Sequence, residues 1–164
     1  MPAAAHHLGL NLAYLLIDAD QKIATKEHIN QALSNVVKGM GQTLLNDWNA
    51  STSSPRKDAL FEQVLLACAL GPRNELGWFR PIDIAEAFRV VSHEPLYGVG
   101  TYSQHLHKLS TERGKVLERR GSIHRFEFRF RKPLFQSYVL MRSLTSGLLE
   151  EKTLTEFKSN LPAQ

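Results

Sequence analysis

The chain has 164 residues, of which 43% are hydrophobic and 22% are charged, and this is the composition of a globular protein with one or two small cores. It excludes a disordered, a fibrous and a disulfide-rich protein. No apolar stretch approaches the roughly 20 residues of a membrane-spanning helix, and the N-terminal residues lack the pattern of a signal peptide. The single cysteine, Cys68, lies in an apolar run and allows no intrachain disulfide. We therefore expect a cytoplasmic protein with no membrane contact.

The positive charge of the chain is concentrated in one region. In total 20 lysines and arginines stand against 16 acidic residues, a formal net charge of +4. Between His105 and Arg142 there are ten basic and three acidic residues, whereas the rest of the chain has ten and thirteen. A local surplus of this kind indicates an anionic partner such as nucleic acid.

Residues 1–50 predict two amphipathic helices. Apolar side chains recur on one face of the first helix, at Leu8, Leu12, Leu15, Leu16 and Ala19. After a turn, Thr25 is predicted to cap a second helix with apolar positions at Ile29, Ala32, Leu33, Val36, Val37, Met40 and Leu44. The short connection predicts antiparallel packing. Because fifty residues bury little apolar surface alone, we expect this segment to pack on a larger body, inside or outside this chain.

The polar segment 49–55 predicts a domain boundary, and residues 54–146 then form a second domain. Ser54 and Pro55 are predicted to begin a helix that ends at Gly71-Pro72, and Pro81 is predicted to open the next one. Between them, residues 78–80 are too short for an independent strand, and their large apolar groups are expected to pack inside. A turn is expected over 92–95. The tail, 147–164, predicts one more weak helix around 148–157.

Thr101 and Gln104 have the spacing of a capping box, which predicts the start of a helix over 102–112. One face of this helix is predicted to pack inward, with Tyr102, Leu106, Leu109 and the stem of Arg113. The opposite face then presents Gln104, His107, Lys108 and Thr111.

A two-stranded hairpin is predicted to follow. Residues 115–119 favour a short strand and 120–122 a turn, after which Phe126, Phe128 and Phe130 alternate with charged residues. This alternation is typical of a strand with one buried and one wet face. Pro133 is predicted to start a further helix.

The order of these elements predicts a mostly α, α+β fold: a helical segment followed by a winged helix-turn-helix domain with a two-stranded wing. Helix 102–112 would lie in a major groove, and the basic wing, 115–131, would reach the adjacent backbone or minor groove of duplex DNA. The candidate nucleic-acid-binding residues are Gln104, His107, Lys108, Thr111, Lys115, Arg119, Arg120 and Arg125.

Several segments carry a family resemblance. They are His6–Leu10, Thr25–Ile29, Phe61–Ala69, Thr101–Leu106 and Phe126–Tyr138. Here the sequence resembles the C-terminal region of AAA+ ATPases related to the archaeal and origin-recognition initiator class, in which a helical lid precedes a winged helix. The resemblance implies a parent that binds ATP and Mg, and it makes residues 1–50 lid-like.

This chain departs from the complete family pattern in two ways. No G-x-x-x-x-G-K-[ST] loop occurs in it, so the resemblance implies an excised or truncated C-terminal region that lacks its ATPase core. In the family an arginine near the start of the lid senses the γ-phosphate, but residues 1–20 contain no arginine. The expected partners are duplex DNA and the ATPase core of the parent, and no cofactor is expected in this chain.

No catalytic or metal-binding motif occurs in the sequence. The pairs His6-His7 and His105/His107 have spacings that point their side chains in different directions on a helix. We therefore predict no catalytic residue, no metal ligand and no enzymatic activity for this chain alone.

Two alternative functions fit the same pattern. The chain could be a protein-interaction or homo-oligomerisation module that does not bind DNA, because the apolar faces of residues 8–44 need cover. It could also be a free-standing winged-helix transcriptional regulator, with the first 50 residues as a dimerisation arm. A DNA-binding function would place the protein on the nucleoid.

Overall fold

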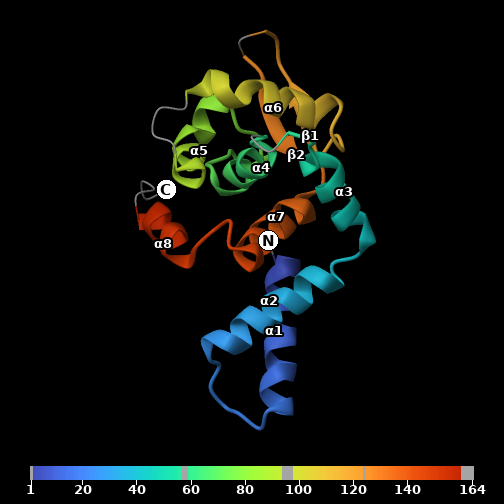
Figure 1. The fold of residues 1–164 in the computed structure, drawn as a ribbon, viewed down its shortest axis with the longest axis vertical. Coiled ribbons are helices and arrows are strands. Elements are labelled where there is room, and N and C mark those ends of the chain that lie inside the picture. Colours follow the sequence, from blue (N-terminus) through green and yellow to red (C-terminus); the bar gives the residue numbers. More distant parts are fainter. Residues whose placement is uncertain (1, 57–58, 94–97, 124, 160–164) are drawn as a thin grey trace.

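The computed structural model describes residues 2–56, 59–93, 98–123 and 125–159, and over these ranges the chain is mostly helical with one small antiparallel sheet (Figure 1). This confirms the predicted α+β class. The elements are α1 (Pro2–Asp18), α2 (Lys26–Gly39), α3 (Gln42–Thr52), α4 (Phe61–Leu70), the 3₁₀ turn η1 (Pro81–Ile84), α5 (Ala85–Ser92), α6 (Val99–Thr111), β1 (Leu117–Arg120), β2 (Glu127–Phe130), α7 (Pro133–Ser146) and α8 (Glu151–Ser159). None of the helices in these ranges combines the length and apolar character that crossing a bilayer requires.

Helices α1 and α2 form an arm that extends from the rest of the molecule (Figure 1). The predicted cap is confirmed: the backbone N–H of His28 donates to the Thr25 hydroxyl, 3.4 Å away, and Nδ1 of His28 accepts from the Thr25 N–H at 3.2 Å. A small apolar cluster joins the arm to α7 through Ala4, Leu33, Val36 and Met141.

The prediction that the second helix continues to Leu44 is wrong. The chain breaks after α2 at Gly41, whose φ of +94° suits glycine, and α3 then starts in a new direction. The segment predicted as a linker is also partly helical, since α3 continues to Thr52. The change of direction places Leu44 and Trp48 in the main core, where the Trp48 ring meets Tyr138 at 6.4 Å between centroids.

The predicted start of the next helix at Ser54-Pro55 is also wrong, because α4 begins at Phe61. The Ser54 hydroxyl accepts the N–H of Arg56 at 3.3 Å and so serves a local turn outside the helix. The predicted end is confirmed at Gly71. A Cβ there would lie 2.8 Å from the Ile84 side chain, so the backbones approach closely where the helix stops.

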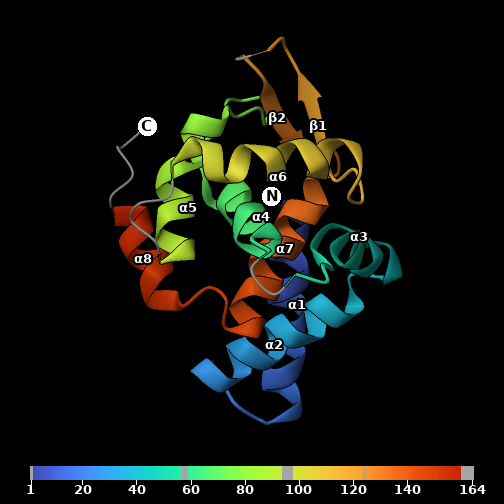
Figure 2. The same cartoon turned by 45° about the horizontal axis from the view of Figure 1, so that its top comes forward.

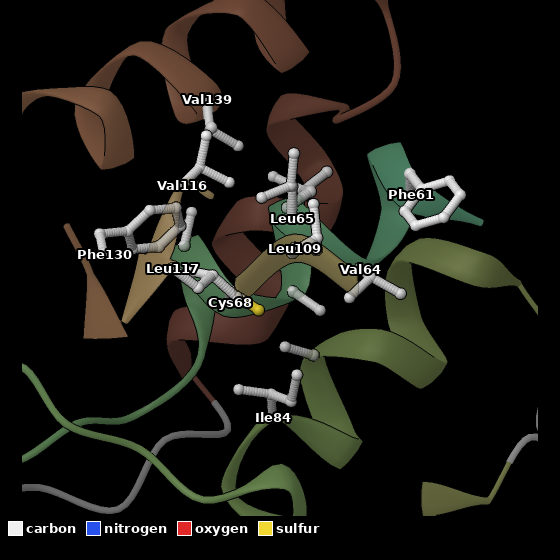
Figure 3. Close-up of a cluster of buried hydrophobic side chains, with 14 of the residues drawn as sticks. Phe61, Val64, Leu65, Cys68, Ile84, Leu109, Val116, Leu117, Phe130 and Val139 are labelled. Carbon is white, nitrogen blue, oxygen red and sulfur yellow. The ribbon is translucent and has the colours of Figure 1, made fainter. Parts of the chain in front are cut away.

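Helix α4 occupies the centre of the core and contacts α5, α6 and α7. Its Val64, Leu65 and Cys68 side chains lie among Ile84 and Leu109 from neighbouring elements (Figure 3). Burial raises the pKa of the Cys68 thiol, so this cysteine stays protonated and acts as a small core residue.

Helix α6 starts earlier than predicted, and the predicted capping box is wrong. The helix begins at Val99 with Gly98 as its N-cap, so Thr101 lies inside the first turn. The predicted inner face is confirmed, since Tyr102, Leu106 and Leu109 are fully buried.

The hairpin pairs β1 with β2 in the register Leu117↔Phe130 and Arg119↔Phe128. Side chains alternate between the two faces of the hairpin. On the face opposite to Leu117 and Phe128, two cross-strand ion pairs of 2.7 Å join Glu118 to Arg129 and Arg120 to Glu127. The first strand begins two residues later than predicted, because Gly114 and Lys115 both adopt left-handed backbone angles.

The extended segment 78–80 joins this sheet as a single bridge. The backbones of Phe79 and Phe128 exchange two hydrogen bonds, of 2.9 and 2.8 Å, and their rings stack at 6.3 Å. Trp78 and Phe79 are 8% and 2% exposed, which confirms that they pack under the hairpin.

The last helices agree with the sequence pattern. Pro133 opens α7, and α8 lies within the tail that was predicted to contain a weak helix. Of the predicted turn over 92–95, His93 ends α5 in the left-handed region, whereas residues 94 and 95 lie outside the described ranges.

Candidate nucleic-acid interface

A groove of about 1120 Å³ lies between α6, η1 and the hairpin. Figure 2 shows α6 running across the molecule with the hairpin rising beside it. Because the side chains of Tyr102, Leu106 and Leu109 point into the core, the opposite, polar face of α6 faces the groove. The hairpin supplies the facing wall, and the bridge between Phe79 and Phe128 brings η1 to its edge.

Five of the eight predicted contact residues line this groove together. They come from α6 and from the hairpin, and all five are exposed: Gln104, His107, Lys108, Arg119 and Arg125. Residues from two separate elements, α6 and the hairpin, thus present hydrogen-bond donors to one space.

Arg119 links the two walls of the groove. Its guanidinium contacts Nδ1 of His107 and lies over the Phe126 ring, 4.5 Å from the centroid. A guanidinium only donates hydrogen bonds, so Nδ1 of His107 is the acceptor in this contact.

The other three predicted residues have different surroundings. The Thr111 hydroxyl donates to the His107 carbonyl at 3.0 Å and so serves the helix backbone. The Arg120 guanidinium pairs with Glu127 and lies 4.3 Å from the Trp78 ring centroid. Lys115 lines a separate hollow at the base of the hairpin. The structure does not bring these three into the groove.

The groove has an excess of positive charge. Four basic residues line it, Arg80, Lys108, Arg119 and Arg125, together with two acidic residues, Glu112 and Glu127. Two of these six charges are already paired, since Glu127 binds Arg120, and Arg80 binds Asp83 at 2.7 Å. Over the described ranges, no carboxylate forms an ion pair with Lys108, Arg119 or Arg125.

Arg80 also lines the groove, although the sequence pattern did not predict it there. The hydrogen bonds from its guanidinium hold the pKa of the Asp83 carboxyl below its usual value. Arg80 reaches the groove through the pairing of residues 79 and 128, and a non-local contact of this kind leaves no trace in a local pattern.

Apolar side chains also line the groove and were not predicted there. Ile82 is 57% exposed and Ile123, in the hairpin loop, is 73% exposed, and Phe126 also lines the groove. An isoleucine in a hairpin turn is unusual for a solvated loop, and this feature was available in the sequence as an indication of a contact surface.

Most other basic residues of the region 105–142 are used in structural contacts. Arg113 donates to the Ser53 carbonyl and lies over the Phe61 ring, and Arg142 lies over the Trp48 ring. Arg129 is held by Glu118. The surplus of charge in the sequence is therefore divided among several surfaces.

His105 belongs to the core side of α6. Its ring meets Phe61 edge-on at 4.7 Å between centroids, and its buried Nδ1 has no hydrogen-bond partner among the described residues. Burial lowers the pKa of His105, and the nearby cations Lys108, Arg113 and Arg56 lower it further. Within the described ranges no three His, Cys, Asp or Glu side chains gather as a metal site.

No family model matches this chain, and comparisons with curated proteins and with solved structures give no significant match. The resemblance to AAA+ ATPases therefore stays a prediction that rests on the residue patterns given above.

Proposed function

We propose that this chain binds duplex DNA as a winged-helix module, with α6 as the recognition helix and the hairpin as the wing. The observation that carries this proposal is the convergence of Lys108, Arg119 and Arg125 on one open groove, where no described carboxylate pairs with them. Cations that are not neutralised within the protein attract the phosphate backbone and release its counterions on binding.

The geometry of α6 suits a major groove. Its 13 residues make a helix about 20 Å long, at about 1.5 Å per residue, and a major groove about 12 Å wide admits such a helix. Gln104 and His107 would offer hydrogen bonds to base edges, while Lys108 and Arg125 would contact phosphates on either side.

We further propose that this module is the regulatory end of an AAA+ family ATPase. The α1–α2 arm precedes the DNA-binding part in the order that the resembled family shows, and it would form the lid against an ATPase core that holds ATP and Mg. The motif for binding those phosphates is missing from this sequence. Nucleotide chemistry would therefore depend on the parent's core.

DNA binding is tested by fluorescence anisotropy with a random duplex of about 25 base pairs, titrated at low and near-physiological salt. The variant Lys108→Ala/Arg125→Ala should bind more weakly, because two phosphates are no longer neutralised by the protein. Its salt slope should be smaller by about 1.8, at roughly 0.9 for each of these phosphates.

The matched control is Lys22→Ala/Lys38→Ala, which removes two exposed lysines from the arm. It should bind like the unmodified chain. Equal weakening in both variants, or no binding of the duplex at low salt, would overturn the proposal.

A second candidate is a protein-docking module that uses the same groove. The exposed Ile82 and Ile123 favour it, because apolar side chains in a groove add affinity for another protein. Homo-oligomerisation through the arm is a related form, since Leu10, Tyr14 and Ile17 are exposed on α1. A chain that fails to bind DNA but elutes as an oligomer would support this candidate, whereas a DNA-bound symmetric dimer would support a free-standing regulator.

A further inference from the structure

A second, smaller hollow of about 220 Å³ lies at the base of the hairpin, next to α3. Three parts of the chain line it. Asp47 comes from α3, Gly114 and Lys115 come from the turn after α6, and Arg131 and Lys132 come from the segment that directly precedes α7. It shares no lining residue with the large groove. Of these residues, only Lys115 is among the predicted DNA contacts.

Two of the three cations in the hollow are held in place by the protein itself. Nε of Arg131 donates to the Lys115 carbonyl at 3.0 Å, and Nζ of Lys132 pairs with Asp47 at 2.6 Å. In the described part of the chain the Lys115 carbonyl and the Asp47 carboxylate are the only partners of these two side chains, so the Nη donors of Arg131 remain for a ligand. Cations that are already oriented lose little side-chain entropy when a ligand arrives.

Gly114 allows the wall of the hollow to close. A Cβ at this position would lie 3.2 Å from Cγ1 of Val116 and 3.3 Å from the Asp47 carbonyl oxygen, and its φ is +61°. The glycine thus lets α3 approach the turn closely. Lys115 follows it with a φ of +48°, also in the left-handed region. The backbone angles of these two residues determine where the Lys115 side chain lies.

We propose that this hollow binds a phosphoryl group. Three cations stand here against one carboxylate, and that carboxylate is engaged by Lys132. A planar guanidinium beside two ammonium groups matches the oxygens of a phosphate, with charge-assisted hydrogen bonds from Arg131 and point charges from the lysines. The volume equals roughly seven waters at about 30 Å³ each, which is enough for a phosphoryl group with some hydration.

The phosphoryl group could come from two sources. Lys115 lies four residues after the end of α6, so a duplex on α6 would bring its own backbone to the hollow. This source rests on the proposed function. A free phosphate-bearing molecule would need no DNA. The chemistry of the site is the same for both, and two experiments separate them.

The first experiment is an NMR titration of the full chain with inorganic phosphate, against chloride at equal ionic strength. The amides of Gly114, Lys115 and Lys132 should shift in a saturable way with phosphate only. The variant Lys115→Asn/Arg131→Gln should lose these shifts, and asparagine is chosen because it tolerates the left-handed backbone angle. Lys22→Ala/Lys38→Ala should keep them. If the double variant unfolds by circular dichroism, Lys115→Asn alone replaces it and should weaken the shifts.

The second experiment measures duplex binding of the same variant against salt. If a backbone phosphate occupies the hollow, the slope should fall by about 0.9, in addition to the decrease caused by Lys108→Ala/Arg125→Ala. Phosphate shifts without any duplex binding would overturn the proposed function and keep the site, with a free phosphate-bearing molecule as its ligand. Duplex binding with an unchanged slope and no phosphate shifts would overturn the site and keep the function.

Discussion

The guanidinium of Arg119 on β1 contacts Nδ1 of His107 on α6, and this contact joins the two walls of the groove. The neighbouring Arg120 points to the other face of the hairpin, where Glu127 and the Trp78 ring hold it. Two adjacent arginines therefore have separate surroundings. One serves the groove, and the other serves the fold of the hairpin.

This difference predicts unequal effects of two similar substitutions. Arg119→Ala should weaken duplex binding several-fold and lower the salt slope by about 0.9, because it removes a groove cation. Arg120→Ala should change duplex binding less and should instead lower the free energy of unfolding, because Glu127 loses its ion pair and Trp78 keeps only the Arg129 guanidinium over its ring. Fluorescence anisotropy measures duplex binding of both variants, and urea denaturation measures their free energy of unfolding. An equal loss of duplex affinity in the two variants would contradict the prediction.

Gly121→Ala should destabilise the hairpin. Gly121 has a φ of +92°, and a Cβ there would overlap the Arg125 carbonyl oxygen. An alanine costs about 1–2 kcal/mol in the left-handed region before this overlap is counted. We expect a lower melting temperature and weaker duplex binding, because the loop that carries Arg125 moves.

The control for this substitution is Gly100→Ala. Gly100 lies in α6 with open space around its Cα and no positive φ. Alanine at this position should raise the free energy of unfolding by about 0.4–1 kcal/mol. Thermal melts of both variants should therefore shift in opposite directions.

His105 should make stability fall at acidic pH. The folded state lowers the pKa of His105 from its ordinary value of 6.5, chiefly by burial, so the unfolded chain takes up a proton first as the pH drops. The stability that His105 contributes is thus complete above about pH 6.5 and is lost as the pH falls through the lower folded pKa, with a slope of at most about 1.4 kcal/mol per pH unit.

Urea denaturation at a series of pH values between 7.5 and 5 measures this dependence. His105→Leu should flatten the pH dependence of stability in this range, since the side chain beside Phe61 then has no ionisable group. A variant with the same acid dependence as the unmodified chain would show that another group is responsible.

Tyr102→Phe should cost about 1 kcal/mol of stability. The hydroxyl of Tyr102 donates to the Pro81 carbonyl at 2.7 Å, and its removal leaves that carbonyl without this donor. Burial also raises the pKa of Tyr102 to about 12, so the unfolded chain loses its phenolic proton first above pH 10. The unmodified chain should lose stability between about pH 10 and 12, and Tyr102→Phe should lose less.

Local patterns in the sequence predicted several elements well. Thr25 caps α2, Gly71 ends α4 and Pro133 opens α7, because each residue acts through its own backbone or a neighbour within one turn. The inner face of α6 was predicted from helical periodicity for the same reason. Side chains three and four positions apart share a face whatever surrounds them.

The errors lie where a long-range contact outweighs a local pattern. The capping box at Thr101 has the correct spacing, yet α6 begins three residues before the predicted start at residue 102, and Thr101 lies inside its first turn. The helix through Leu44 has correct periodicity, yet the chain turns at Gly41 so that Trp48 can pack on Tyr138. Packing in the core stabilises the protein more than an unbroken helix or a single cap does.

The sequence by itself determined the α+β class, the order of helices and hairpin, and the region where positive charge gathers. These depend on periodicity, turn residues and composition, which are local properties. Only the tertiary structure decided which charges share a surface. Lys108, Arg119 and Arg125 line one groove, whereas Lys115 lines a second, separate hollow. The reason is physical, because the direction of each side chain follows from the packing of its element against distant ones, such as the pairing of Phe79 with Phe128.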